Sequence, residues 1–300
     1  MNPKHIILTL LLMLCPIGMA AQSTITRNKP KPPVTKPKPA AKPKPKAKTK
    51  PAPRRNNTSH SGSTSSTVSL SAELNKLINN MVYVSGGTFT MGATSEQGSE
   101  AYDNEKPTHS VTLSSYYICK YEVTQALWQA VMGSNPSYFE GDNLPVENVS
   151  WNDCQTFIKR LNSYTGRNFR LPTEAEWEFA ARGGNYSRHY KYSGSNYIGD
   201  VAWYTDNSGS RTHSVGTKRA NELGLYDMSG NVFEWCSDQY GPYDSYSQTD
   251  PLGPNGWSDR VLRGGCWNDR TGDCRSSNRY GGTPDDGGSD SGLRLILSHL

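Results

Sequence analysis

The feature that most constrains this chain is the separation of its charges along the sequence. Residues 1–72 contain 13 basic residues and no Asp or Glu, whereas residues 73–300 contain 19 basic and 27 acidic residues. The net charge of +5 for the whole chain therefore hides a basic N-terminal part and a remainder with net charge −8. An acidic folded part argues against nucleic-acid binding, which needs basic groups on the folded surface.

The first 20 residues have the pattern of an export signal. Lys4 precedes an apolar run at 6–14, and small residues follow, with cleavage predicted after Ala20. The run is much shorter than the ~20 apolar residues that span a bilayer, so we expect no transmembrane segment after cleavage. The mature protein is expected outside the cytoplasm, in the periplasm or the extracellular space. Lipidation at Cys15 is an alternative fate of this segment.

Residues 21–71 are expected to form a linker. Residues 29–55 contain nine prolines and eleven basic residues, which leave little to bury and favour an extended, polyproline-II-like spacer. The Ser/Thr/Asn-rich residues 56–70 are expected to be disordered. The basic spacer has two interpretations, which are a solvated linker and an adhesive segment for anionic envelope groups, such as peptidoglycan carboxylates or lipid headgroups.

Residues 72–300 fit one folded domain of the α+β class with a high loop content. The patterns predict a helix at 71–80, a strand–turn–strand at 81–91, a strand at 110–121, and helices at 124–132, from 150 and at 173–182. Ser150 with Asp153, and Thr173 with Glu176, have the spacing of capping boxes. After residue 185, Gly, Asn, Ser and Asp dominate, and loops of this length need metal ions, disulfides or aromatic stacking to order them.

Three glutamates lie close together in the helix predicted after Thr173. Helical spacing places Glu174 and Glu178 on one face and turns Glu176 away. Pairing with Arg170 or Arg182, or helix capping, explains this cluster better than catalysis does.

Five stretches in a fixed order carry a resemblance to a known family. They are YEVTQALWQAVMGSNPSYF (121–139), LPVENVSWNDC (144–154), FRLPTEAEWEFAARGG (169–184), NELGLYDMSGNVFEWCSDQY (221–240) and RVLRGGCWNDRTGDCRSSNR (260–279). Together with SGLRLIL at 291–297, they strongly resemble the formylglycine-generating enzyme (sulfatase-modifying factor) family. The resemblance implies an irregular, loop-rich, C-type-lectin-like fold. The implied activity is the copper-dependent oxidation of a protein cysteine, as in sulfatases, to formylglycine.

The resemblance also implies a calcium site formed by Asp227, Gly230, Val232 and Glu234. Their spacing of 3, 2 and 2 alternates carboxylate side chains with backbone carbonyls. Ca²⁺ takes six to eight oxygen ligands of this kind. The alternative is that Asp227 and Glu234 cap turns and pair with arginines.

The family binds Cu⁺ through two cysteines that lie five residues apart. Counted from Gly264-Gly265, the first position is Asp269 here and the second is Cys274. A carboxylate is a poor ligand for Cu⁺, which selects soft thiolates. Either the domain has lost the oxidase activity and Cys274 is a packed thiol, or Cys266 replaces the missing ligand and pairs with Cys274.

Two functions from different classes follow. The first is an exported oxidoreductase that acts on a cysteine of a sulfatase-like protein substrate through Cys274. The second is a catalytically inert, calcium-stabilised lectin-like module that binds a cell-envelope partner or a glycan. The substitution at Asp269 favours the second.

Overall fold

The computed structural model describes residues 63–298. The predicted signal (1–20) and basic spacer (29–55) lie outside the described residues. Within 63–298, no helix has both the length and the apolar character needed to cross a bilayer.

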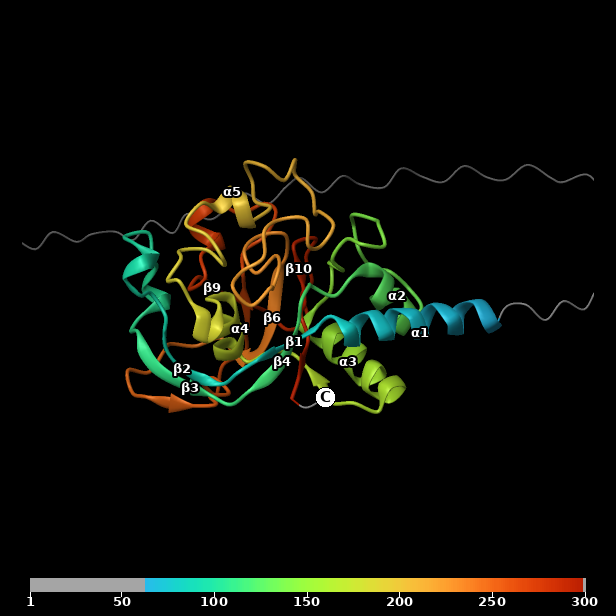
Figure 1. The fold of residues 1–300 in the computed structure, drawn as a ribbon, viewed down its shortest axis with the longest axis horizontal. Helices are drawn as coiled ribbons and strands as arrows, with labels where there is room; N and C mark the ends of the chain where they lie inside the picture. Colours follow the sequence, from blue (N-terminus) through green and yellow to red (C-terminus); the bar gives the residue numbers. More distant parts are fainter. Residues whose placement is uncertain (1–62, 299–300) are drawn as a thin grey trace, which may run out of the picture. The chain divides into compact units, whose positions relative to one another are not determined.

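Three small sheets organise the domain (Figure 1). The first has the order β1 (Met81–Val84), β4 (Tyr116–Cys119), β11 (Ile296–Leu297) and β5 (Phe169–Arg170). The second has the order β10 (Ser291–Gly292), β6 (Phe233–Gln239), β8 (Arg260–Arg263) and β9 (Arg279–Gly282). The third has the order β2 (Gly87–Met91), β3 (His109–Leu113) and β7 (Gln248–Thr249). The β10–β6 and β3–β7 pairs are parallel and the others antiparallel.

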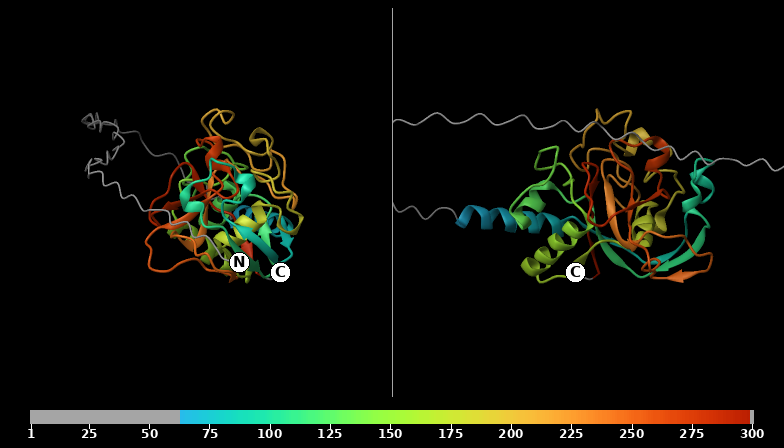
Figure 2. Two further views of the ribbon diagram at one scale, coloured as in Figure 1. Left: turned by 90° about the vertical axis from the view of Figure 1, so that its left-hand side faces the viewer. Right: turned by 180° about the vertical axis from the view of Figure 1, so that it is seen from behind.

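The helices gather mainly on one side of the first sheet. Helices α1 (Ser63–Asn79), α2 (Gln125–Met132) and α3 (Trp151–Thr165) lie together, opposite the third sheet, as the view from behind also shows (Figure 2). Helix α4 (Glu174–Ala181) lies between the second and third sheets, and α5 (Ile198–Val201) is a single turn within the long loops. Four 3-10 turns complete the list: η1 (Ser95–Gln97), η2 (Asp103–Glu105), η3 (Gly184–Tyr186) and η4 (Thr271–Cys274). This mixed architecture confirms the predicted fold class.

The helix N-termini confirm the predicted caps. The Thr124 hydroxyl accepts a hydrogen bond from the backbone N–H of Leu127 at the start of α2 (3.3 Å). Reciprocal capping boxes join Ser150 to Asp153 at α3 and Thr173 to Glu176 at α4. Capping side chains satisfy backbone N–H groups that have no partner inside the helix, which is why these motifs fix helix starts locally.

The entry helix is longer than predicted. It begins at Ser63 rather than near residue 71, so the predicted disorder over 56–70 is wrong for its last eight residues. Ser and Thr disfavour a helix only slightly, and propagating an existing helix is much easier than starting one. The partly buried Leu70, Leu74 and Ile78 pack against the core and hold the later turns.

Two predicted strand segments are each divided between sheets. The single strand predicted over 110–121 breaks at Ser114-Ser115 into β3 and β4, which belong to different sheets. The two strands of 81–91 do not pair with each other, because β1 pairs with β4 and β2 pairs with β3. Gly86 lies where the chain changes sheets, and a Cβ there would come 2.3 Å from the Leu113 carbonyl oxygen.

Four arginines lie inside the domain with at most 1% of their surface exposed. They are Arg263, Arg275, Arg279 and Arg294. Each meets a buried glutamate: Arg275 with Glu105, Arg263 with Glu174 and Glu178, Arg279 with Glu174, and Arg294 with Glu234. These pairs connect loops and strands that are distant in the sequence.

The glutamates of α4 are ion-paired, as predicted. Glu176 accepts two hydrogen bonds from Arg170, both of 2.7 Å. Glu178 meets Arg182 at 2.8 Å. Glu174 and Glu178, on one helix face, both reach Arg263.

Glu105 provides a test of these buried pairs. Burial alone would raise its pKa, but hydrogen bonds from Arg275 and Ser277 outweigh burial and lower the pKa below 4.5. Glu105→Gln should reduce the free energy of unfolding by about 3 kcal/mol at pH 7, because Arg275 loses its buried counter-charge. Asp103→Asn, at a fully exposed side chain two residues away, should cost under about 0.5 kcal/mol.

Urea unfolding of both variants measures this difference. A lowered folded-state pKa adds stability above the unfolded-state value, and that stability is lost as the pH falls through the lowered value. The difference in free energy of unfolding between the parent and Glu105→Gln should therefore become smaller below about pH 4. Equal costs for the two variants at pH 7 would contradict this account of Glu105.

Candidate functional site

Cys266 and Asp269 close a tight loop after β8. Gly264 and Gly265 precede it with φ angles of 96° and 73°, in the left-handed region that favours glycine. The Asp269 carboxylate accepts a hydrogen bond from the backbone N–H of Cys266 (3.0 Å), and the Asp269 N–H donates to the Cys266 carbonyl (3.1 Å). Asp269 thus stabilises the turn that leads away from Cys266.

Cys274 lies at the end of η4, directly behind this loop. A Cβ at Gly265 would come 2.9 Å from the Cys274 sulfur, so only glycine allows the two loops to approach. Cys274 has no exposed surface and packs with Tyr192 and Val201. Cys266 packs instead into the main core with residues of α2 and α3.

Both thiols are held in their neutral form. Burial raises the pKa of Cys266 far above its usual value, and the negative charge of Asp269 raises it further. Burial, followed by the charges of Asp269 and Asp273, has the same effect on Cys274. Each of the five cysteines in the described part of the chain is free. A neutral, buried thiol is a weak nucleophile and a weak metal ligand.

This arrangement does not fit the family's copper centre. Cu⁺ requires soft thiolates, whereas the first ligand position holds Asp269, whose carboxylate binds a backbone N–H. Between residues 63 and 298, no three His, Cys, Asp or Glu side chains converge in the manner of a metal site. Burial raises the pKa of Asp269 to about 6, and the charge of Asp273 adds to the rise.

Asp227 has part of the geometry expected of a calcium ligand. It is 3% exposed and has a φ of 57°. Its Oδ2 accepts a hydrogen bond from the Gly216 N–H (2.7 Å), while Oδ1 is buried without a partner. Burial raises the pKa of Asp227 to about 6. An unpartnered buried oxygen of this kind suits a cation.

Glu234 does not complete that site. Its oxygens accept hydrogen bonds from Arg294 (Nη2, 2.6 Å) and from the indole N–H of Trp177 (2.7 Å). Asp227 Oδ1 and the two predicted carbonyls, of Gly230 and Val232, supply at most three oxygens, against the six to eight that Ca²⁺ takes. The guanidinium of Arg294 supplies the positive charge that a calcium ion would bring to Glu234, so the residues as arranged do not fit calcium.

Glu122 belongs to the same cluster, and the sequence reasoning missed it. It is 2% exposed, and its two oxygens accept hydrogen bonds from the Asn231 side chain (2.7 Å) and the Val232 N–H (3.2 Å). Burial raises its pKa, as do the charges of Asp227 and Glu234. The sequence signal for Arg294 is a single charge inside the apolar run 293–297, whereas Glu122, with Lys120 and Thr124 close by, has no comparable signal.

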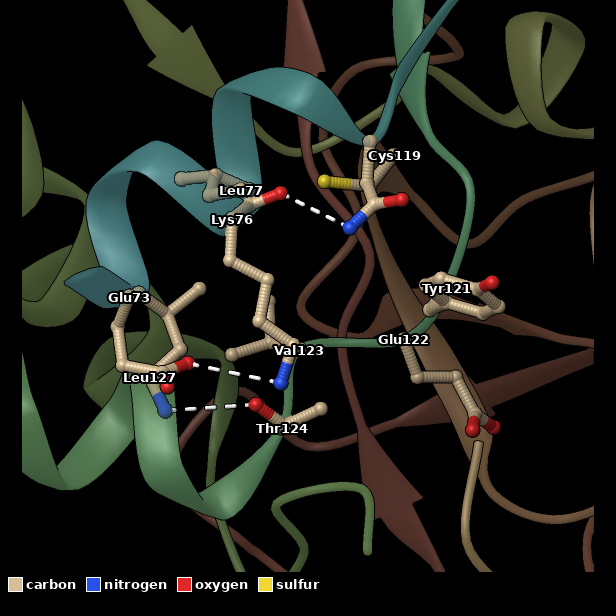
Figure 3. Close-up of a pocket in the computed structure, with 10 residues that line it drawn as sticks. Glu73, Lys76, Leu77, Cys119, Tyr121, Glu122, Val123, Thr124 and Leu127 are labelled. Atoms are coloured by element: carbon tan, nitrogen blue, oxygen red, sulfur yellow. Dashed lines mark hydrogen bonds and ion pairs between the residues drawn. The ribbon is translucent and has the colours of Figure 1, made fainter. Parts of the chain in front are cut away.

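Glu122 is also one of the residues that line a small cavity beneath α1. Figure 3 shows Val123 on the side of Leu77 and Leu127, with Glu122 extending in the opposite direction. The cavity has a volume of about 40 Å³. That volume suffices for a few water molecules and for no larger ligand.

The fold and this altered site define a C-type-lectin-like domain of the formylglycine-generating type. The sulfatase-modifying factor enzyme 1-like domain family matches residues 67–299. The chain therefore belongs to the sulfatase-modifying factor family, which confirms the resemblance found in the sequence.

Several characterised proteins are similar to the domain. The "Chaperone protein LppX" of Paenibacillus barcinonensis is 36% identical over 272 residues, covering 73% of this chain and 90% of that protein. The "Formylglycine-generating enzyme" of Streptomyces coelicolor is 30% identical over 282 residues, covering 71% and 87%. The family thus includes relatives named as enzymes and relatives named otherwise.

Solved structures support the same family. "Treponema denticola variable protein 1" superposes with a TM-score of 0.67 at 35% identity, covering 73% of this chain and 95% of that chain. The "Structure of PvdO from Pseudomonas aeruginosa" gives a TM-score of 0.61 at 27% identity, covering 73% and 94%.

The thiol environment predicts slow alkylation. In the folded protein at pH 7.5, N-ethylmaleimide should leave Cys266 and Cys274 unmodified, because both thiols are buried and neutral. In guanidinium chloride both should react fully. Peptide mapping by mass spectrometry distinguishes the two cysteines. Rapid native labelling of either one would show a reactive thiolate that this geometry does not provide.

Because Arg294 already pairs with Glu234, we predict that the thermal stability of the domain depends little on calcium. A structural calcium bound at 100 times its Kd would add about 2.7 kcal/mol, enough to raise Tm by roughly 5–10 °C in a domain of this size. We expect a shift below about 2 °C between EGTA and millimolar calcium, measured by scanning calorimetry. A larger rise with calcium, but not with magnesium, would show that Arg294 gives way to the ion.

Proposed function

We propose that this protein is an exported, non-oxidase member of the sulfatase-modifying factor family that binds a protein partner in the cell envelope. One observation carries the proposal: the first copper-ligand position holds Asp269, which is engaged in a turn with the Cys266 backbone. The remaining Cys274 is fully buried and neutral. A domain without a thiolate pair retains the fold and lacks the means to bind Cu⁺.

The names of two relatives support a binding role. The Paenibacillus relative is named a chaperone protein, and the Treponema relative a variable protein. Both match this chain at higher identity than the Streptomyces enzyme does, 36% and 35% against 30%. A chaperone acts by binding other proteins, so protein binding is the role that we carry over to this chain.

The N-terminal sequence supports action outside the cytoplasm. The signal pattern over 1–20 directs export, and the basic spacer over 29–55 suits contact with anionic envelope groups. The domain beyond it is acidic. In this proposal the spacer holds the domain near the envelope, and the domain recognises the partner.

Formylglycine generation is the second candidate function. It is favoured by the proximity of the Cys274 sulfur to Gly265, next to Cys266, which places two thiols on adjoining loops. A relocated thiolate pair would need both protons removed on copper binding. Ultraviolet titration with Cu⁺, comparing the parent with Cys266→Ser, tests this pair, since a thiolate–copper band in the parent alone would support it.

The proposal predicts no aldehyde formation. The protein is coexpressed with a sulfatase that carries a C-x-P-x-R motif, and the motif peptide is analysed by mass spectrometry. We expect the unmodified cysteine, whereas the Streptomyces enzyme as control should give the loss of about 18 Da that marks the thiol-to-aldehyde change. A loss of that mass with this protein would overturn the proposal, and dependence on Cys266 would identify the relocated pair.

A further inference from the structure

A cleft of about 460 Å³ lies on the domain away from the altered copper site. It is bounded by the N-terminus of α4 on one side and by the loop 242–255, which carries β7, on the other. This loop is drawn in orange at the lower left of Figure 1, beside β2 and β3. The volume falls within the range of sites that bind small ligands or single side chains.

Asp238, at the end of β6, lines the cleft and is 3% exposed. Its Oδ2 accepts hydrogen bonds from the Glu174 N–H (3.0 Å) and from the Ser237 hydroxyl (2.9 Å). No donor among the described residues reaches Oδ1, and this atom is not sealed inside the protein. Gly253 crosses beside it, and a Cβ there would come 2.9 Å from Oδ1. Glycine at 253 therefore keeps one oxygen of a buried carboxylate uncovered.

No ion pair joins Asp238 to a lysine or arginine of the described chain. The charges of Glu174 and Glu176 on α4 add to the rise in its pKa, and Arg170 lies near enough to interact with its charge. Arg263 and Arg279 compensate Glu174, and Arg170 compensates Glu176. None of the residues that line the cleft is a lysine or an arginine. Burial, with a further effect from Glu174, raises the pKa of Asp238 to about 7.

One histidine, His109, is among the residues that line the cleft. His109 is 5% exposed, its Nδ1 lies 3.2 Å from the Pro107 carbonyl, and its ring meets Tyr243 edge-on at 4.9 Å. It does not pair with Asp238 in any hydrogen bond or ion pair of the described chain. Among the described residues, the Asp238 carboxyl group at this cleft therefore has no ion-pair partner.

The loop 242–255 brings both polar side chains and the apolar or aromatic side chains of Tyr243, Tyr246 and Leu252 to the wall of the cleft. Tyr246 and Leu252 are 62% and 77% exposed, and Tyr243 is half-buried between them and the domain. Aromatic faces attract cations, and apolar walls cover the methylene stem of a long basic side chain. A buried carboxylate below such walls selects a ligand with an apolar stem and a positive end.

We propose that this cleft binds a lysine or arginine side chain of the partner protein, with its positive end on Oδ1 of Asp238 and its stem against Tyr246 and Leu252. This deepens the proposed function, on which it rests, by stating which feature of the partner is recognised. An anionic ligand is disfavoured by Asp238 and Asp244. A neutral glycan could contact the tyrosines, but its hydroxyls would leave the buried charge uncompensated.

The test uses blocked single amino acids as probes. Nα-acetyl-lysine amide and Nα-acetyl-arginine amide are titrated into the full chain to about 20 mM and followed by protein NMR. Nα-acetyl-norleucine amide, which has the stem without the charge, is the matched control. We expect binding of both basic probes, at least tenfold stronger than that of norleucine and weakened by salt. Equal binding of norleucine, or no binding of either basic probe, would overturn the proposal.

Asp238→Asn is the decisive variant. The amide oxygen can still accept the hydrogen bond from the Glu174 N–H at the start of α4. The variant should therefore fold with an unchanged or higher Tm. It should bind the basic probes at least tenfold more weakly. Asp103→Asn removes the same charge from an exposed position and should leave binding unchanged. Retained binding in Asp238→Asn would overturn the assignment.

A second variant and a sugar probe separate the remaining outcomes. Leu252→Ala changes an exposed side chain, carries little folding risk, and should weaken the basic probes about threefold. If N-acetylglucosamine oligomers bind both the parent and Asp238→Asn, the ligand is a glycan, and the assignment of a basic side chain is overturned. The two proposals fail in different experiments. The proposed function fails if the sulfatase peptide contains formylglycine, whereas the cleft assignment fails if the basic probes do not bind.

Discussion

Buried pairs of arginine and glutamate are the interaction on which the rest of this structure depends. Most of the residues beyond α4 form loops, which cannot satisfy their polar groups through regular ladders. Arg275 donates to Glu105 across 170 residues of sequence, and Arg294 binds Glu234, the Cys119 carbonyl and the Tyr226 carbonyl together. Such pairs do not stabilise a fold merely because they are buried, since desolvation offsets their attraction. Removing one partner is costly, however, so each pair specifies one arrangement of the loops.

Intrachain pairs also engage residues for which the family resemblance implies metal binding. Arg294 provides the positive charge next to Glu234, where the family resemblance implies calcium. Asp269 closes a turn on the Cys266 N–H, where the family resemblance implies a thiolate. Hydrogen bonds and ion pairs within the chain thus engage Glu234 and Asp269, whereas Asp227 keeps Oδ1 without a partner. Asp238 differs from Asp227 because its unpartnered oxygen belongs to a residue that lines a cleft and is not sealed inside the protein. The cleft beside α4, rather than the loop of Cys266 and Asp269, therefore holds the polar group that is free to bind a ligand.

The accuracy of the sequence predictions followed the range of the interactions involved. Caps at Thr124, Ser150 and Thr173 were predicted correctly, because the side chain and the N–H that it satisfies are three residues apart. The pairing of the α4 glutamates with Arg170 and Arg182 was also correct, over six and four residues. Strand pairing was not, because whether β1 pairs with β2 or with β4 depends on contacts that no local pattern encodes. The roles of Glu122 and Arg294 were missed for the same reason.

The sequence by itself determined the division between a basic N-terminal part and an acidic remainder, the family, and the presence of Asp269 where the resemblance implies a copper-binding cysteine. Composition and residue identity decide these, and neither requires coordinates. Only the tertiary structure decided that Cys266 and Cys274 pack into different apolar clusters, and that Glu234 faces an arginine. It also decided that Asp238 lies below an aromatic cleft with one oxygen unpaired. The physical reason is that burial and charge compensation arise from groups far apart in sequence, and folding alone brings them within hydrogen-bond distance.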